Sequence, residues 1–128
     1  APRSLAGFRP IATGLSGGVT LLGTAATVAG AIVVASVSQF AAVAAFWPVA
    51  IGGVAGALVD SLLGATLQAQ RWCSQCARPC ETGVHRCGSQ TALRRGLQWV
   101  ENDAVNVAAT LTGALIAGSL AAFAAKSR

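Results

Sequence analysis

The chain has 128 residues, of which 54% are hydrophobic and only 10% are charged, and its formal net charge is +5. No charged residue occurs in 10–59 or in 104–125, which argues against a soluble domain, because soluble helices need charges on their outer faces. The pattern predicts an all-α integral membrane protein, since about 20 helical residues cross the hydrocarbon core of a bilayer; the alternative is a helix pair buried inside a soluble complex.

The first two membrane spans are predicted at about 19–40 and 48–68. The loop 13–18, which contains two adjacent glycines, precedes the first span. Trp47 and Pro48 mark the start of the second, because tryptophan is enriched at the bilayer interface and proline fits the first turn of a helix. The lipid bilayer is therefore the first predicted partner of this chain.

A polar segment, 70–101, follows the second span. It holds five Arg, all four Cys and the only His. The third span is predicted at about 103–125, because Asn102 or Asp103 can cap its start and Lys126 follows its end. The prediction is one membrane domain, 1–128, with a Cys- and His-rich loop between its second and third spans.

The distribution of basic residues predicts the orientation. With three spans, the N-terminal tail and the Cys-rich loop lie on the same side of the membrane, and they contain seven Arg, whereas the other side has only Lys126 and Arg128. The positive-inside rule places the side with more Arg in the cytoplasm. Attraction to anionic head groups explains the basic composition, and we expect no nucleic-acid partner.

The Cys-rich loop has the ligand spacing of a metal site. Cys73 and Cys76 form a Cys-x-x-Cys motif, and His85 and Cys87 form a His-x-Cys motif further along. Zinc binds four tetrahedral thiolate and imidazole ligands, and a two-residue spacer lets both sulfurs reach one ion. We predict that these four residues hold a structural zinc ion, which would stabilise a loop without an apolar core.

Cys80 leaves alternatives open. It is either a spare thiol or a substitute for His85 as a metal ligand. The four cysteines would instead form two disulfides or a redox pair in an oxidising compartment, and plain free thiols are a third interpretation. The predicted cytoplasmic location disfavours disulfides, because that compartment is reducing.

Asp60 is the one acid within a predicted span. Four residues turn a helix roughly 40° beyond a full turn, so Asp60, Gly64 and Gln68 share one face. An ionisable residue within a span is costly unless it faces a polar cavity, which makes Asp60 a functional candidate. The simpler interpretation is that Asp60 is solvated near the cytoplasmic end. Gly52 and Gly56 form a neighbouring stripe suited to close helix packing.

Further polar groups gather at the predicted cytoplasmic ends of the first and third spans. They are the side chains of Ser16, Thr20, Thr24, Asn102 and Asn106 and the backbone of Gly17 and Gly18. Backbone N–H groups of a glycine pair can approach a phosphate at a helix N-terminus. Helix capping and hydrogen bonds within or between helices are the alternative roles of the hydroxyl and amide side chains.

Three blocks of the sequence carry a resemblance to a known family. Ser-Gly-Gly-Val-Thr begins at Ser16, Asp-Ser-Leu-Leu-Gly-Ala-Thr-Leu-Gln begins at Asp60, and Asn-Asp-Ala-Val-Asn begins at Asn102. In this order they resemble the integral membrane family once called domain of unknown function 92, which includes transmembrane protein 19 and the plant phytyl-phosphate kinase of tocopherol synthesis. Bacterial members carry a similar Cys-x-x-Cys and His-x-Cys insert.

The resemblance implies a membrane-embedded kinase that transfers a phosphoryl group from a nucleotide to an isoprenyl (phytyl-like) phosphate, with Mg²⁺ as cofactor. The implied catalytic residues are Asp60, Ser61, Gln68, Asn102 and Asn106. The implied substrate-binding residues are Ser16, Gly17, Gly18, Thr20 and Thr24. Family members are longer, so we expect this chain to be a C-terminal portion that needs an N-terminal half as its partner for activity.

Two other functions agree with the same residues. One is a non-enzymatic integral membrane protein whose polar residues only join helices and whose zinc loop is structural. The other is a small transporter, in which Asp60 would bind a proton or a cation.

Overall fold

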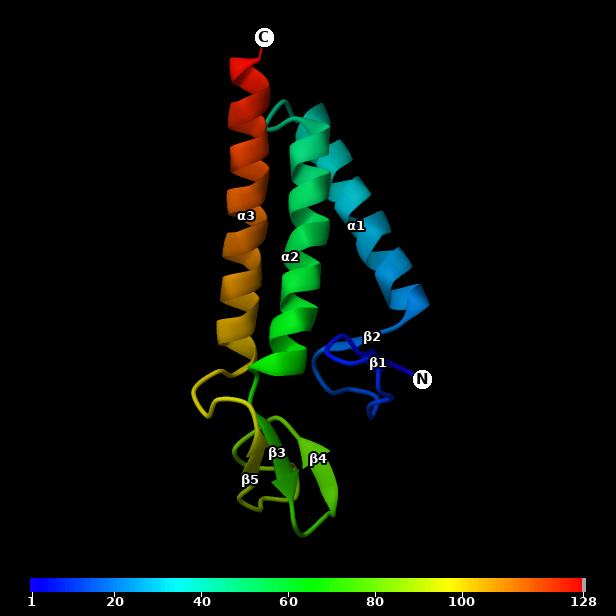
Figure 1. The fold of residues 1–128 in the computed structure, drawn as a ribbon, viewed down its shortest axis with the longest axis vertical. Helices are drawn as coiled ribbons and strands as arrows, with labels where there is room; N and C mark the ends of the chain where they lie inside the picture. Colours follow the sequence, from blue (N-terminus) through cyan, green and yellow to red (C-terminus); the bar gives the residue numbers. More distant parts are fainter. Residues whose placement is uncertain (128) are drawn as a thin grey trace. The chain divides into compact units, whose positions relative to one another are not determined.

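The computed structural model describes residues 1–127, which form three helices and five short strands (Figure 1). The helices are α1 (Leu21–Phe40), α2 (Phe46–Thr66) and α3 (Asn102–Lys126). All three are long and apolar enough to cross a membrane. The predicted spans are thus confirmed as helices, with boundaries that differ by one or two residues.

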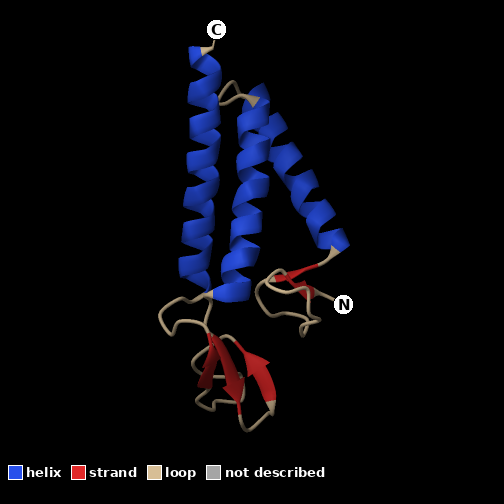
Figure 2. Cartoon of the chain, viewed as in Figure 1, coloured by secondary structure: helices blue, strands red, loops and turns tan. Residues whose placement is uncertain are grey.

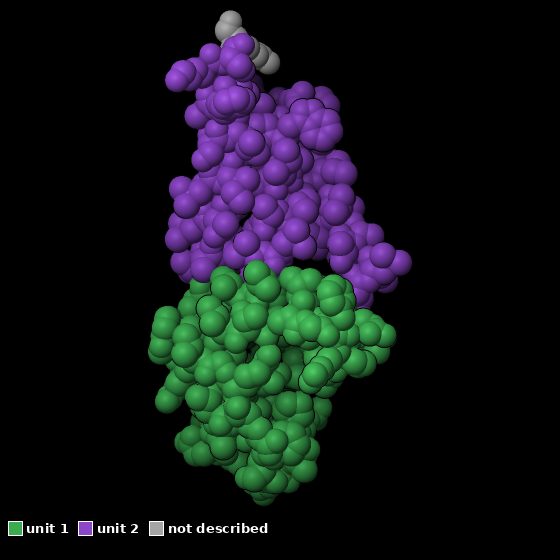
Figure 3. Space-filling model, viewed as in Figure 1, with its two compact units in different colours: residues 1–19, 61–106 green, residues 20–60, 107–128 purple. Residues whose placement is uncertain are grey.

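The chain divides into two compact units (Figure 3). Unit 1 contains residues 1–19 and 61–106, and unit 2 contains residues 20–60 and 107–128. Unit 2 contains most of the helical residues, whereas unit 1 contains all five strands, the Cys-rich loop and one end each of α2 and α3. The single membrane domain that the sequence predicts is therefore built from two structural parts, and each is described separately below.

The helix boundaries have local causes. The side chain of Thr20 caps α1 by accepting a hydrogen bond from the N–H of Gly23 at 2.9 Å. Helix α2 begins at Phe46, two residues before Pro48. Proline is tolerated in this first turn, because the first N–H groups of a helix have no intrahelical partner. It ends at Thr66 rather than Gln68, where the carbonyl of Leu67 accepts instead from the N–H of Leu97.

Small residues bring α2 and α3 into close contact within unit 2. A Cβ atom on Gly52 would lie 2.5 Å from the carbonyl oxygen of Gly113, and a Cβ atom on Gly56 would lie 3.0 Å from that of Ala109. Larger side chains would therefore separate the two backbones. The close packing expected of Gly52 and Gly56 is confirmed, and it follows the small-residue pattern of membrane helices.

Large apolar side chains of the helices are exposed. Leu21 and Phe40, at the two ends of α1, are 91% and 92% exposed, and Phe123 of α3 is 75% exposed. In water such surfaces would be unfavourable by roughly 25 cal/mol per Å² of apolar area. Lipid removes this cost, so the exposure agrees with an integral membrane protein.

Unit 1 corrects the all-α fold class that we expected. Strands β1 (Arg3–Ser4) and β2 (Gly18–Val19) pair with each other, and strands β3 (Gln70–Cys73), β4 (Arg78–Cys80) and β5 (Ala92–Arg95) form an antiparallel sheet in the order β4-β3-β5 (Figure 2). These strands have two to four residues. Segments this short have no readable apolar alternation, which is why the sequence pattern did not predict them.

The packing of α2 on α3 predicts the effect of a larger side chain at Gly113. A Cβ atom there would lie 2.8 Å from the carbonyl oxygen of Gly52, whereas a Cβ atom on Gly118 of the same helix would meet nothing within 4 Å. We expect Gly113→Val to destabilise the folded protein by about 2 kcal/mol, as overpacking does. Thermal unfolding in detergent measures the change, and Gly118→Val is the control; equal losses in both variants would contradict the predicted close packing.

Candidate metal site and polar node

The four predicted metal ligands come together in the structure. Cys73 is the last residue of β3, Cys76 lies in the turn before β4, and His85 and Cys87 lie in the loop between β4 and β5. The Sγ and ring nitrogen atoms that they offer all lie within 4.8 Å of one another. We call these four residues the metal group, because such an arrangement could hold a metal ion.

The geometry of the metal group suits tetrahedral coordination. The Sγ atoms of Cys73 and Cys87 are 3.6 Å apart, and Nδ1 of His85 is 3.2 Å from Sγ of Cys87. Zinc–sulfur bonds of about 2.3 Å place two sulfurs of a regular tetrahedron roughly 3.8 Å apart. A disulfide requires about 2.05 Å, and all four cysteines are free.

Backbone turns create this arrangement. Ala77, directly after Cys76, adopts a left-handed conformation with φ of 48°, and Gly88, directly after Cys87, has φ of 83°. The N–H of Gly88 donates to the carbonyl of His85 at 2.8 Å, and the N–H of His85 donates to the carbonyl of Ser89 at 2.9 Å. Two tight turns therefore aim the four ligands at one point.

The electrostatics of the metal group favour a cation. Hydrogen bonding with Ser89, and then with His85, lowers the pKa of the Cys87 thiol to about 5. The hydrogen bond with Cys87, together with desolvation, raises the pKa of the Cys76 thiol to about 11. The two sulfurs thus resist carrying two negative charges together, and a divalent ion would stabilise both thiolates.

Cys80 lies outside the metal group. It is a half-buried residue of β4 and pairs across the sheet with Arg71 of β3. The group therefore contains His85 rather than Cys80, which agrees with the prediction that Cys80 is spare.

A second cluster, which we call the polar node, consists of Ser16, Gln68 and Glu81. The carboxylate of Glu81 accepts hydrogen bonds from the backbone N–H of Ser16 at 2.6 Å and from its hydroxyl at 2.8 Å. The Gln68 side-chain amide donates to the same carboxylate at 3.1 Å and to the Ser16 hydroxyl at 3.0 Å. Gln68 is only 3% exposed. The node therefore joins three segments that are distant in the sequence.

Glu81 is a residue that sequence reasoning missed. It is the only acidic residue in 61–100, a segment with five Arg, and that isolation was the one available signal. Acidic residues on loops are usually solvated, so nothing in the sequence indicated that this carboxylate accepts bonds from Ser16 and Gln68.

The predicted glycine site has a packing role. Gly17 is buried with φ of 77°, and any side chain on it would overlap the backbone of Ala65 in α2. A Cβ atom on Gly64 would in turn lie 2.8 Å from the N–H nitrogen of Gly17. Gly18, in β2, is exposed. Gly17 and Gly64 thus let the N-terminal loop lie directly against α2.

The remaining predicted site residues are more scattered. Asp60 and Ser61 are half-exposed on α2, and Asn102 and Asn106 are exposed in the first turns of α3. Thr20 and Thr24 belong to unit 2, where Thr20 caps α1 and Thr24 is exposed. The carboxylate of Asp60 has no hydrogen-bond or ion-pair partner among residues 1–127, so it is available to a cation.

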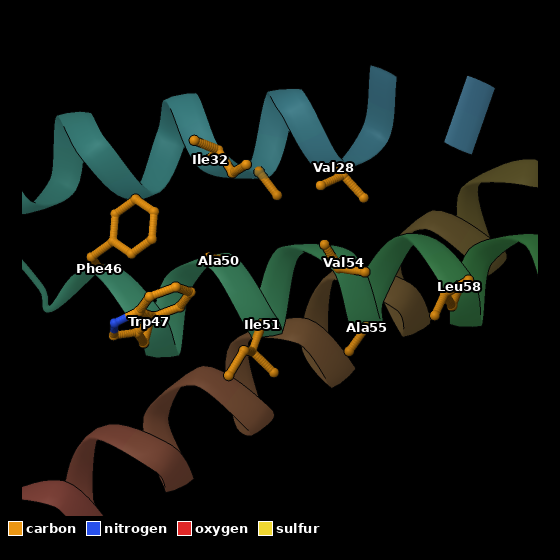
Figure 4. A pocket seen from close by; sticks show the side chains of 10 residues that line it. Val28, Ile32, Phe46, Trp47, Ala50, Ile51, Val54, Ala55 and Leu58 are labelled. Carbon is orange, nitrogen blue, oxygen red and sulfur yellow. The ribbon is translucent and has the colours of Figure 1, made fainter. Parts of the chain in front are cut away.

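Unit 2 contains an apolar groove between α1 and α2 (Figure 4). Its volume is about 490 Å³, and only apolar side chains and Trp47 line it. Val28 of α1 and Val54 of α2 point toward each other across the groove. A groove of this kind accepts a hydrocarbon chain and rejects a polar group.

The comparison with known families agrees with this structure. The chain matches the family described as "Integral membrane protein DUF92" over residues 1–114. No curated protein and no solved structure matches it. The matched range includes all residues of the metal group and of the polar node.

The metal group predicts which cysteines retain a bound metal ion. We expect purified protein to contain about one metal ion per chain, and Cys73→Ser to lose it, because Cys73 contributes a buried ligand. Cys80→Ser removes a thiol outside the group and should keep the metal. Elemental analysis of both purified variants checks this; retention of the metal by Cys73→Ser would show that the ligands are different.

Proposed function

Since the chain belongs to the integral membrane protein family DUF92, we propose that it is part of a membrane-embedded kinase that transfers a phosphoryl group from a nucleotide to an isoprenyl phosphate. In this proposal it forms the C-terminal part of a longer protein. The reaction class rests on the resemblance to the phytyl-phosphate kinase within this family.

The single observation that carries the proposal is the polar node. Ser16 and Gln68 belong to two of the three sequence blocks behind the family resemblance, and their side chains are 3.0 Å apart although 52 positions separate them. If Ser16 and Gln68 only held helices together, they would not both need to donate to the carboxylate of Glu81. Convergence on Glu81 is what a site for a polar ligand requires, because buried polar groups must be positioned by hydrogen bonds.

The proposal assigns different roles to the two carboxylates. Glu81 accepts three hydrogen bonds and positions Ser16 and Gln68. Asp60 has no hydrogen-bond or ion-pair partner among residues 1–127 and is the proposed ligand of Mg²⁺. Asn102 and Asn106, by themselves, are proposed as phosphate contacts. Mg²⁺, when bound, would supply the positive charge that phosphoryl transfer requires.

The metal group has a structural role in this proposal, and its ion is zinc. Three thiolates and one imidazole are the ligands that zinc prefers, and a closed set of four protein ligands leaves no position for a substrate. The apolar groove of unit 2 suits the isoprenyl chain of the substrate, because it offers no polar contact.

We also propose that the Cys-rich loop faces the cytoplasm, where nucleotide is available. Cysteines introduced at Gln90 and Ser127 would then lie on opposite sides of the membrane. An impermeant thiol reagent added to intact cells should label Ser127→Cys more strongly than the parent protein. Gln90→Cys should be labelled no more than the parent. The reverse pattern would place the loop outside.

Turnover distinguishes the proposed kinase from the alternatives. Asp60→Asn should abolish isoprenyl-phosphate-dependent nucleotide consumption by the full-length protein, because the amide keeps the shape and loses the charge that holds a divalent ion. Asn106→Ala should reduce it less, since water can replace one neutral oxygen. Turnover is measured per folded molecule, with membrane insertion as the control.

Two outcomes would count against this function. Normal turnover in Asp60→Asn would remove Asp60 from the site. Absence of any substrate-dependent nucleotide consumption by the parent protein would favour the non-enzymatic function, and solute flux into vesicles would identify a transporter.

A further inference from the structure

Unit 1 contains a second pocket, distinct from the metal group. Its volume is about 500 Å³, and its polar lining comes from the N-terminal loop and the sheet: Ser4, Arg9, Ser16, Gln70 and Arg95. No acidic residue lines it. The pocket thus combines two guanidinium groups with hydroxyl and amide side chains.

The N-terminal loop is built to present Arg9. The N–H of Ser4 donates to the carbonyl of Arg9 at 2.9 Å, and the N–H of Phe8 donates back to the carbonyl of Ser4 at 2.9 Å. Gly7, with φ of 116°, allows the tight turn between them. Arg9 itself is exposed, and its guanidinium has no partner among residues 1–127.

Arg95 reaches the pocket from strand β5. Its Nη1 atom donates to the carbonyl of Ala65, near the end of α2, at 2.5 Å. This bond anchors the side chain and leaves its other N–H groups for a ligand. The neighbouring Arg94 is oriented differently, since its guanidinium lies over the ring of Trp72 at 4.4 Å.

The pocket offers hydrogen-bond donors that the polar node does not have available. An anion at the Ser16 loop cannot use the N–H or the hydroxyl of Ser16, because both already donate to Glu81. Gly17 lies against α2. The two arginines of the pocket remain as charged donors, beside the side chains of Ser4 and Gln70.

The charge of unit 1 supports an anionic ligand. Unit 1 has seven Arg and three acidic residues, and one of these acids, Glu81, is engaged by Ser16 and Gln68. Two guanidinium groups recognise a phosphomonoester well, because each offers paired N–H donors to a dianion.

We infer that the pocket lined by Arg9 and Arg95 binds the phosphomonoester group of a ligand. The shared chemistry is a terminal phosphate, which an isoprenyl monophosphate or a nucleotide can supply. The identification of this phosphate as a substrate group rests on the proposed function, whereas anion binding by the pocket does not.

The test is a binding measurement that requires no turnover. The protein is reconstituted in phosphatidylcholine nanodiscs, and binding of geranyl phosphate and of a non-hydrolysable ATP analogue is measured by titration, with geraniol as the uncharged probe. We expect one of the two phosphate ligands to bind and geraniol to bind at least tenfold more weakly. The ligand that binds identifies the source of the phosphate.

Variants locate the binding site. Arg9→Gln should weaken binding about tenfold, in line with the loss of one charge-assisted contact, and it leaves the fold intact because Arg9 makes no side-chain bond. Arg95→Gln should weaken binding further. Arg78→Gln, an exposed residue of β4 outside the pocket, removes the same charge and should bind like the parent.

The outcomes separate this inference from the proposed function. Equal weakening in Arg9→Gln and Arg78→Gln, or displacement of the ligand by phosphatidylglycerol in the nanodisc, would assign binding to overall positive charge and overturn the inference. If the parent protein shows kinase turnover and Arg9→Gln binds the ligand as tightly as the parent, the inference about the pocket is overturned. The proposed kinase function is then unaffected. Arg9-dependent binding without turnover would support the pocket and count against the kinase.

Discussion

Unit 1 depends on one carboxylate that accepts three hydrogen bonds. Glu81 lies in the Cys-rich loop, Ser16 in the N-terminal loop and Gln68 directly after α2, and the bonds of Glu81 hold these segments together. Losing the carboxylate would leave one N–H of the buried Gln68 amide, and the N–H and hydroxyl of Ser16, without an acceptor, which is costly. Other bonds position the two arginines of the pocket: Ser4 bonds to the carbonyl of Arg9, and Arg95 bonds to the carbonyl of Ala65.

The metal group gives the Cys-rich loop a centre that its apolar side chains do not provide. Cys73 is fully buried, whereas Leu93 and Leu97 in the same segment are 41% and 42% exposed. A loop with so little apolar burial gains too little free energy to order itself. A bound ion would supply this stability. It would also order strand β4, which directly precedes Glu81.

The two units have different chemistry. Unit 2 combines small residues, which let α2 and α3 approach, with outward apolar side chains and an apolar groove. Unit 1 combines a basic pocket, a carboxylate and a metal group. The apolar groove suits a hydrocarbon chain, and the basic pocket suits an anionic group.

The sequence by itself determined the three long apolar helices and the four residues that come together as the metal group, because both depend on local spacing. Uncharged runs predict helices in lipid whatever their neighbours are, and Cys-x-x-Cys brings two sulfurs together within one turn. Tertiary structure alone decided the small sheets, the hydrogen bonds of Glu81 and the presence of Arg9 and Arg95 in one pocket. Those features join residues that lie far apart in the sequence, such as Ser16 and Glu81, and a contact at such separation leaves no periodic pattern. Only the folded chain shows that Gly17 packs on α2 and that Glu81 engages the donors of Ser16.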